Sequence, residues 1–239
     1  MIGPLIRKLE RLGALSDEDR RVLEALPLAP KAVEADRDLA HDGDPAAQCQ
    51  LLVEGFACRS KVLEDGRRQI VGFHFPGDIV DLTNLLLRQM DHTVSTLTPA
   101  KVVPIAHATI LGWVRDHPDL GRLLWRDTLI EAAIFREWVV NVGRRTARER
   151  TAHLLCELMT RMHAAGLARD HACDLPITQV ELADALGLSN VHVNRTLQEL
   201  RGDGLIELGG GTLVVRDWEG LKAAGGFNLG YLHHLASEL

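Results

Sequence analysis

The polar side chains of residues 190–198 stand in a pattern that suits contact with another molecule. Val193, Leu197 and Leu200 recur at steps of four and three residues, which predicts one buried face of a helix over Asn190–Gly202. The outward side chains near the start of that helix are Asn190, Val191, His192, Asn194, Arg195 and Gln198. An arginine guanidinium can donate two parallel hydrogen bonds to O6 and N7 of guanine, so Arg195 could read a base edge.

A second amphipathic segment precedes this helix and turns sharply into it. Thr178 can cap a helix that runs to Leu186. Gly187 can take the left-handed conformation that a sharp turn needs, and Ser189 can cap the following helix. A plain helical hairpin is the alternative. The order of cap, turn glycine and second cap, followed by polar outward side chains, favours a helix-turn-helix.

Two further features fit a protein that lies on DNA. A Gly209–Gly211 turn separates two short apolar runs, Ile206–Leu208 and Thr212–Val215, which predicts a hairpin that would act as a wing. Phosphate contacts, which set register rather than sequence, are expected from Thr178, Gln179, Ser189 and His192. For His192 a solvated helix residue is an equal alternative.

The N-terminal half has a different pattern. From about Ala32 to Ala106 the apolar runs are short and separated by turn signals such as Asp65-Gly66 and Pro76-Gly77. Spacing of this kind predicts a small antiparallel barrel or jelly roll.

A long helix is predicted between the two halves. Residues 120–142 contain no proline and a single glycine, Gly121, and carry apolar side chains around much of the helix. Such a helix must cover its apolar stripe, and we expect pairing with a second copy of the chain. A core helix lying across the barrel is the alternative.

These motifs together resemble the CRP/FNR family of transcription regulators. The resemblance rests on the helix-turn-helix and on the following segments: Leu51–Gly55, Asp65–Ile70, Phe75–Ile79 and Arg144–Leu155. It implies an α+β fold with an N-terminal antiparallel β-roll (jelly roll), a long dimerisation helix and a C-terminal winged helix-turn-helix. The expected domains are 1–118 (cyclic-nucleotide-binding-type sensor), 119–143 (dimerisation helix) and 144–239 (DNA-binding domain with a C-terminal tail).

The family resemblance also refines the expected DNA contacts. Arg195 stands where similar family members place a guanine-reading arginine. Asn190-Val191 stands where the best-known members have Arg-Glu. Valine can touch only apolar groups such as a thymine methyl, so the half-site is expected to differ from that of the cyclic-AMP receptor.

In relatives that bind cyclic AMP, a phosphate-binding segment follows the Pro-Gly-Asp turn. When that segment is aligned with this chain without gaps from Gly77-Asp78, the expected effector positions are Gly77, Asp78, Leu82, His92 and Thr93. Leu82 replaces the ribose-binding Glu, and His92-Thr93 replaces the Arg-Ser pair. A histidine of ordinary pKa is mostly neutral at pH 7, so the sequence argues against cyclic AMP.

Other cofactors find weak support in the sequence. The first of the four cysteines, Cys49, lies too far along the chain for the N-terminal cluster ligands of the oxygen-sensing branch, which argues against an iron–sulfur cluster. Haem stays open through His74 or His92, although a structural role is the simpler interpretation. His153 and Cys156 are interpreted as a surface histidine beside a buried cysteine, and no metal site is expected.

The net charge of −6 taken alone points away from nucleic acid. Residues 144–239 hold 10 basic and 12 acidic groups, so even the proposed DNA-binding half is acidic. Residues 190–198, however, contain Arg195 and no carboxylate. We therefore expect weak non-specific binding and a dependence on dimer geometry and a few base contacts.

We expect a cytoplasmic, homodimeric regulator that binds double-stranded DNA at a palindromic site, with activity modulated by the sensor domain. It would contact RNA polymerase if it activates, and no membrane is expected to be a partner. The alternative is a small-molecule, haem or redox sensor whose main output is a protein–protein contact. The sequence lacks the Walker A, GxSxG and HExxH motifs, which argues against an enzyme.

Overall fold

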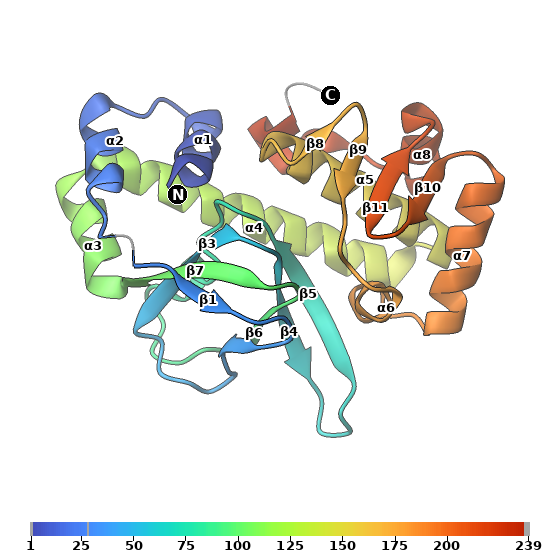
Figure 1. The fold of residues 1–239 in the computed structure, drawn as a ribbon, viewed down its shortest axis with the longest axis horizontal. Helices are drawn as coiled ribbons and strands as arrows, with labels where there is room; N and C mark the ends of the chain where they lie inside the picture. Colours follow the sequence, from blue (N-terminus) through green and yellow to red (C-terminus); the bar gives the residue numbers. More distant parts are fainter. Residues whose placement is uncertain (1, 28, 237–239) are drawn as a thin grey trace. The chain divides into compact units, whose positions relative to one another are not determined.

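The computed structural model of the protein describes residues 2–27 and 29–236. The chain forms two compact units, residues 1–65 with 72–131 and residues 66–71 with 132–239, called unit 1 and unit 2 below. Helix α4 (Pro118–Arg144) continues through the boundary at Glu131 (Figure 1). The predicted domain ends at residue 1 and at 237–239 lie outside the described residues.

Unit 1 begins with two short helices, α1 (Gly3–Leu12) and α2 (Asp17–Glu24), and ends with α3 (His107–Asp116) and the first part of α4. Between them lie β1 (Lys31–Val33), β2 (Asp38–Ala40), β3 (Gln48–Glu54), β4 (Ala57–Val62), β5 (Arg68–His74), the 3-10 helix η1 (Leu82–Asn84), β6 (Thr93–Thr96) and β7 (Ala100–Ala106). Residues 68–71 of β5 are counted with unit 2.

The strands of the β-roll form two sheets, with strand orders β1-β7-β3 and β2-β6-β4-β5. The ladder between β3 and β7 is antiparallel, with Gln48 opposite Ala106 and Leu52 opposite Val102. Apolar residues that point inward, such as Leu52, Val94 and Val102, form a buried cluster. Of the antiparallel barrel or jelly roll expected from the turn spacing, the two antiparallel sheets fit the jelly roll.

One turn of the β-roll shows why glycine is needed there. Gly55 links β3 to β4 with φ of +89°, and a Cβ built on it would lie 2.5 Å from the carbonyl oxygen of Pro99. Any other residue would combine a strained backbone with a steric clash.

Unit 2 consists of the second part of α4, helices α5 (Ala147–Ala164), α6 (Gln179–Leu186), α7 (Asn190–Gly202) and α8 (Trp218–Gly225), and the 3-10 segment η2 (Leu229–Ala236). A small sheet of order β10-β11-β9-β8 joins β10 (Ile206–Gly209), β11 (Thr212–Val215), β9 (Ala172–Asp174) and β8 (Ala168–Arg169). The predicted hairpin at residues 206–215 is confirmed, whereas no strand was predicted where β8 and β9 lie.

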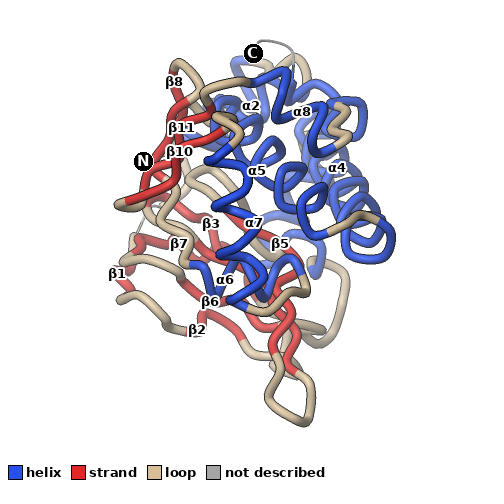
Figure 2. The backbone as a smooth tube through the Cα atoms, turned by 90° about the vertical axis from the view of Figure 1, so that its right-hand side faces the viewer, coloured by secondary structure: helices blue, strands red, loops and turns tan. Residues whose placement is uncertain are grey.

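Helix α5 is the centre of unit 2. Leu154, Leu155, Leu158 and Met162 are all at most 2% exposed. Helices α6, α7 and α8 pack against α5, and Figure 2 shows α5, α6 and α7 beside one another. The α+β class expected from the sequence is confirmed.

Candidate nucleic-acid interface and sensor residues

The start of α6 is fixed by reciprocal hydrogen bonds. The Thr178 hydroxyl accepts from the backbone N–H of Glu181 at 3.2 Å, and the Glu181 carboxylate accepts from the backbone N–H of Thr178 at 2.6 Å. This capping box satisfies two backbone donors at the helix start. The cap predicted at Thr178 is present, and the Thr-x-x-Glu spacing was a signal that the sequence interpretation did not use.

The turn between α6 and α7 has the geometry expected for Gly187. Its φ of 61° and ψ of 39° lie in the left-handed region, and its N–H donates to the carbonyl of Ala183. The next helix then begins at Ser189, whose hydroxyl accepts from the backbone N–H of His192 at 3.3 Å. Both predictions for this turn, the left-handed glycine and the serine cap, are confirmed.

Helix α7 divides into a buried and an exposed face. Val193, Leu197 and Leu200 are fully buried. The exposed side chains of α7 among the predicted contact residues are Asn190, Val191, Asn194, Arg195 and Gln198, and His192 is half-buried. Val191 is 82% exposed, so its methyl groups are open to contact with another molecule. Thr178, Gln179 and Ser189 are exposed around the start of each helix.

Two of the exposed α7 side chains already have polar partners. The Asn194 side-chain amide donates to the Gln179 side-chain oxygen at 3.1 Å. The Arg195 Nε lies 3.9 Å from the Glu199 carboxylate, four residues later on the helix. The pairing with Glu199 was not predicted, although the i, i+4 spacing of opposite charges could have indicated it.

Arg150 is a positioning residue that the sequence interpretation missed. From α5 its guanidinium donates to the carbonyl of Leu186 at 2.8 Å and to the carbonyl of Arg145 at 2.9 Å. It therefore binds the C-terminal end of α6, where carbonyl groups lack helix partners and a cation is favoured. This contact fixes α6, and through the turn α7, on α5.

The predicted effector residues Gly77 and Asp78 have structural tasks in unit 1. A Cβ on Gly77 would lie 2.8 Å from the carbonyl carbon of Pro4, so the glycine permits close approach of α1. The Asp78 carboxylate accepts from Lys8 of α1 at 2.8 Å and from the backbone N–H of Phe75 at 3.0 Å.

The other three effector positions do not fit a cyclic phosphate. Leu82 is buried, and the Thr93 hydroxyl accepts from the backbone N–H of Asp42. His92 is 7% exposed, and its Nδ1 lies 2.6 Å from the Asp91 carboxylate. Burial lowers the pKa of His92 against the opposing effect of Asp91, so the ring is neutral at pH 7. These positions supply no permanent cation for a phosphodiester.

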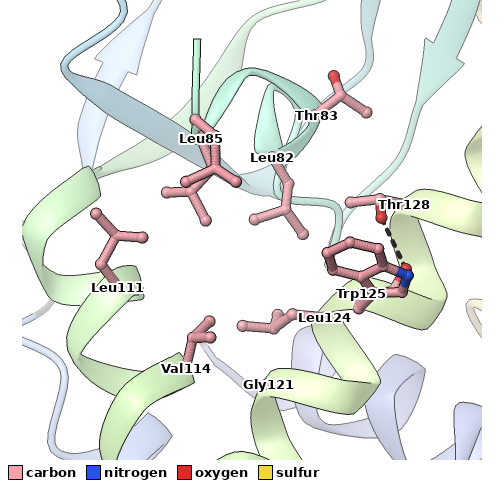
Figure 3. Close-up of a pocket in the computed structure, with 10 residues that line it drawn as sticks. Leu82, Thr83, Leu85, Leu111, Val114, Gly121, Leu124, Trp125 and Thr128 are labelled. Carbon is pink, nitrogen blue, oxygen red and sulfur yellow. Dashed lines mark hydrogen bonds between the residues drawn. The ribbon is translucent and has the colours of Figure 1, made fainter.

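An apolar cavity of about 290 Å³ lies elsewhere in unit 1 (Figure 3). Its walls include Leu82 but none of the other four predicted effector residues. His74, one of the conceivable haem ligands, is also absent from these walls. It is 1% exposed, and its Nδ1 lies 3.4 Å from Asp78 and 3.9 Å from Glu131.

The cysteines and His153 are buried groups. Cys49, Cys58, Cys156 and Cys173 are all buried, and burial raises the pKa of Cys173 to about 12. The interpretation of His153 as a surface residue is wrong, because it is 1% exposed and its ring stacks on that of Tyr231. Within residues 2–27 and 29–236, no group of three or more His, Cys, Asp or Glu side chains is arranged to hold a metal ion.

Comparison with known proteins identifies both units. Residues 30–117 match the family described as cyclic nucleotide-binding domain, and residues 149–224 match the family described as Crp-like helix-turn-helix domain.

In the described part of the chain, no helix is both long and apolar enough to span a bilayer.

Full-length relatives extend this match over most of the chain. A probable transcriptional activator of Rhizobium leguminosarum bv. viciae is 32% identical over 82% of this chain and 80% of its own length. The transcriptional activator protein FnrL of Cereibacter sphaeroides is 31% identical over 77% of this chain and 75% of its own length. Among solved structures, FixK2 from Bradyrhizobium japonicum is similar with a TM-score of 0.76 and 27% identity, over 83% of this chain and 98% of that one.

Proposed function

The chain belongs to the CRP/FNR family of transcription regulators, and on that premise we propose that it is a homodimer that binds a palindromic DNA site through α7. The N-terminal unit is proposed to modulate this activity. The protein is proposed to act by binding and not by catalysis.

The observation that carries the proposal is the exposed N-terminal face of α7. Helix-turn-helix proteins insert the N-terminal residues of the second helix into the major groove. On α7 the outward residues Asn190, Val191, Asn194 and Arg195 are exposed, and all except Val191 are polar. The Gly187 turn and the Ser189 cap fix the path of the chain from α6 into α7. The outward residues lie on a helix whose other face is fully buried, so the surface is rigidly supported.

Within that surface the residues take different roles. Arg195 would donate to guanine O6 and N7, and Val191 would contact a thymine methyl. Asn190, Asn194 and Gln198 lie on the same exposed face and are proposed as further base or backbone contacts. Thr178, Gln179, Ser189 and His192 would contact phosphates and set the register.

The homodimer is supported by an exposed apolar stripe on α4. Phe135, Val139 and Val142 follow one another at steps of four and three residues, and Phe135 and Val139 are 50% and 59% exposed. Further toward the start of the helix, Trp125 and Leu129 are 65% and 53% exposed. This spacing is the seam of a two-stranded coiled coil, in which each helix covers the stripe of the other.

A two-fold dimer would present two copies of α7 to one face of the DNA. Its half-sites would be centred about 34–36 Å apart, one helical turn of B-DNA, and would form an inverted repeat. Several curated relatives are named transcriptional activators. We therefore propose that this chain contacts RNA polymerase when bound at its site.

The decisive experiment measures DNA binding by wild type and Arg195→Ala. Selection from random duplexes by the wild-type protein should yield an inverted repeat with a G·C pair read in each half-site. Fluorescence anisotropy on that duplex should show a loss of about 1–3 kcal/mol per contact in Arg195→Ala, with the preference at that base pair relaxed.

Arg115→Ala is the matched control, because it removes the same charge from an exposed position on α3 in unit 1. It should bind the selected site like the wild type. An Arg195→Ala protein with unaltered base preference would overturn the base-reading role. A wild-type protein with no preference over random DNA would instead favour a sensor whose output is a protein–protein contact.

The dimer is tested separately by Val139→Glu, which places a carboxylate in the proposed coiled-coil seam. Light scattering should show a monomer where the wild type is a dimer. Affinity for the full palindrome should fall to that for a single half-site. An unchanged mass would contradict the proposed role of the α4 stripe.

A further inference from the structure

The apolar cavity of unit 1 has no part in the DNA-binding surface. It is a partly open cavity of about 290 Å³ (Figure 3). Its walls come from η1 and the turn after it, from α3 and from the first part of α4. Of the positions where relatives hold a cyclic nucleotide, it shares only Leu82. It is therefore a separate cavity, and its chemistry can be derived from its own walls.

One wall is aliphatic. It is formed by Leu82, Leu85 and Leu86 from η1 and the turn after it, and by Leu111 and Val114 from α3. Leu86 is 75% exposed, and Leu111 and Val114 are each 41% exposed. So much exposed aliphatic surface around one concavity is a feature of ligand-binding grooves.

The opposite wall comes from α4. Gly121, Leu124, Trp125 and Thr128 are spaced by three, one and three residues, so they share one face of the helix. A Cβ on Gly121 would lie 3.3 Å from the Cα of Val114, so the glycine allows α3 and α4 to approach closely at the base of the cavity. In Figure 3 the Trp125 indole lies at the edge of the cavity.

The polar groups of the cavity already have partners. The Thr128 hydroxyl donates to the backbone carbonyl of Trp125 at 2.7 Å, and the Thr83 hydroxyl accepts from the Arg59 guanidinium at 3.3 Å. None of the ten lining residues carries a charge. An ionic ligand would lose its hydration here without gaining a counter-charge, which is strongly unfavourable.

We propose that this cavity binds a small, neutral, apolar molecule of about the size of a two-ring aromatic compound. An apolar cavity of about 150 Å³ is known to hold benzene, so 290 Å³ suits a ligand of roughly twice that size. The Trp125 indole would pack against a ring of the ligand edge to face or offset-stacked.

A second copy of the chain is the competing occupant, because Trp125 also belongs to the proposed dimer stripe of α4. The composition of the walls favours the small molecule. Six of the ten lining residues come from η1, the turn after it and α3. These elements make the surface concave beside α4, whereas a partner helix needs only the convex stripe of α4 itself.

The test uses the full-length protein, with naphthalene as the neutral probe and 2-naphthoate as its charged counterpart. Calorimetric or dialysis titration should show saturable binding of one naphthalene per chain. Binding of 2-naphthoate should be at least tenfold weaker. Val114→Trp and Leu111→Trp place an indole in the cavity from half-exposed positions, and each should weaken naphthalene binding at least tenfold.

Leu87→Trp is the control, because Leu87 is 48% exposed and does not line the cavity. It should bind naphthalene like the wild type. The proposal is overturned if the wild type shows no saturable binding, or if both filled variants bind as the wild type does. It is also overturned if only the Val139→Glu protein binds naphthalene, since the second copy would then cover the cavity. None of these results depends on DNA binding.

Discussion

The two halves of α4 are held by buried ionic groups of opposite kinds. In unit 1 a lysine of α1, Lys8, lies 2.8 Å from Asp127 of α4 and 2.8 Å from Asp78. In unit 2 the buried acid Glu157 of α5 accepts from the Trp138 indole of α4 at 3.0 Å. We call these two groups the unit 1 anchor (Lys8 with Asp78 and Asp127) and the unit 2 anchor (Glu157 with its hydrogen-bond donors). In the first, one cation lies between two carboxylates. In the second, one carboxylate accepts hydrogen bonds from several side chains.

In the unit 1 anchor, Asp78 and Asp127 share one lysine, Lys8. Burial lowers the pKa of Lys8, but attraction by Asp127 and Asp78 outweighs it, so the pKa lies above its ordinary value. Nearby Glu131 of α4 lies 3.3 Å from Arg59, yet burial raises its pKa above the usual range. Three acids, Asp78, Asp127 and Glu131, therefore lie beside the two permanent cations Lys8 and Arg59.

In the unit 2 anchor, several side chains donate to the single carboxylate of Glu157. Besides Trp138, Glu157 accepts from the Tyr231 hydroxyl at 2.8 Å and lies 3.4 Å from Arg161. Burial raises the pKa of Glu157 against the effect of these partners. Loss of one donor should therefore destabilise unit 2 little, whereas loss of Lys8 should destabilise unit 1 strongly.

Lys8→Met is expected to give the largest effect. It keeps the apolar stem and leaves Asp78 and Asp127 buried without their cation, so unit 1 should lose about 3–5 kcal/mol. Hydrogen exchange of α1 and of the first part of α4 measures this loss. Arg11→Met, at an exposed position of α1, is the control. If Lys8→Met and Arg11→Met show equal hydrogen-exchange rates in α1 and α4, unit 1 does not depend on Lys8 more than unit 2 depends on any one donor.

A pH titration should destabilise unit 2 through His153. Burial is the main cause that lowers its pKa to about 4, against the attraction of Glu137 and together with the repulsion of Arg145. The unfolded chain takes up a proton near pH 6.5, and the folded chain only near pH 4. The free energy of unfolding should therefore fall as pH falls from 6.5 to 4, by on the order of 3 kcal/mol.

Denaturant titrations that follow hydrogen exchange in α5 would measure this dependence. His153→Phe keeps a ring between Phe227 and Tyr231, which both contact His153. This variant should lose most of the pH dependence in that interval. If it keeps the full slope, another group is responsible.

Tyr231→Phe is expected to give the smallest effect. It removes one donor to Glu157, while Trp138 and Arg161 remain, so unit 2 should lose about 1 kcal/mol. Chemical denaturation of the variant and the wild type measures the difference. A loss as large as that in Lys8→Met would show that the unit 2 anchor also depends on one partner.

The DNA-binding half was largely predictable because its signals are local. Thr178, Gly187 and Ser189 act within one or two turns of the residues they cap, and the period of Val193, Leu197 and Leu200 marks the buried face directly. The winged hairpin was found from Gly209–Gly211 for the same reason. The short strands β8 and β9 were missed, because two or three residues carry no detectable period.

Long-range pairing explains what the sequence could not show. Lys8 and Asp127 are 119 residues apart, and no local pattern connects them. His153 was placed on the surface because its residue type is polar, but the rings of Phe227, just after α8, and Tyr231 of η2 pack against it. Leu82 was assigned to a nucleotide site by position, whereas its surroundings are aliphatic.

The pairs on α7 bear on how the protein would search DNA. Arg195 and Asn194 already have partners, Glu199 and Gln179, so a base or phosphate must replace an existing contact. Encounters with wrong sequences would then gain little, and the protein should dissociate from them quickly. Only a duplex that satisfies the displaced groups would hold it for long, so this surface should discriminate through residence time more than through the rate of capture.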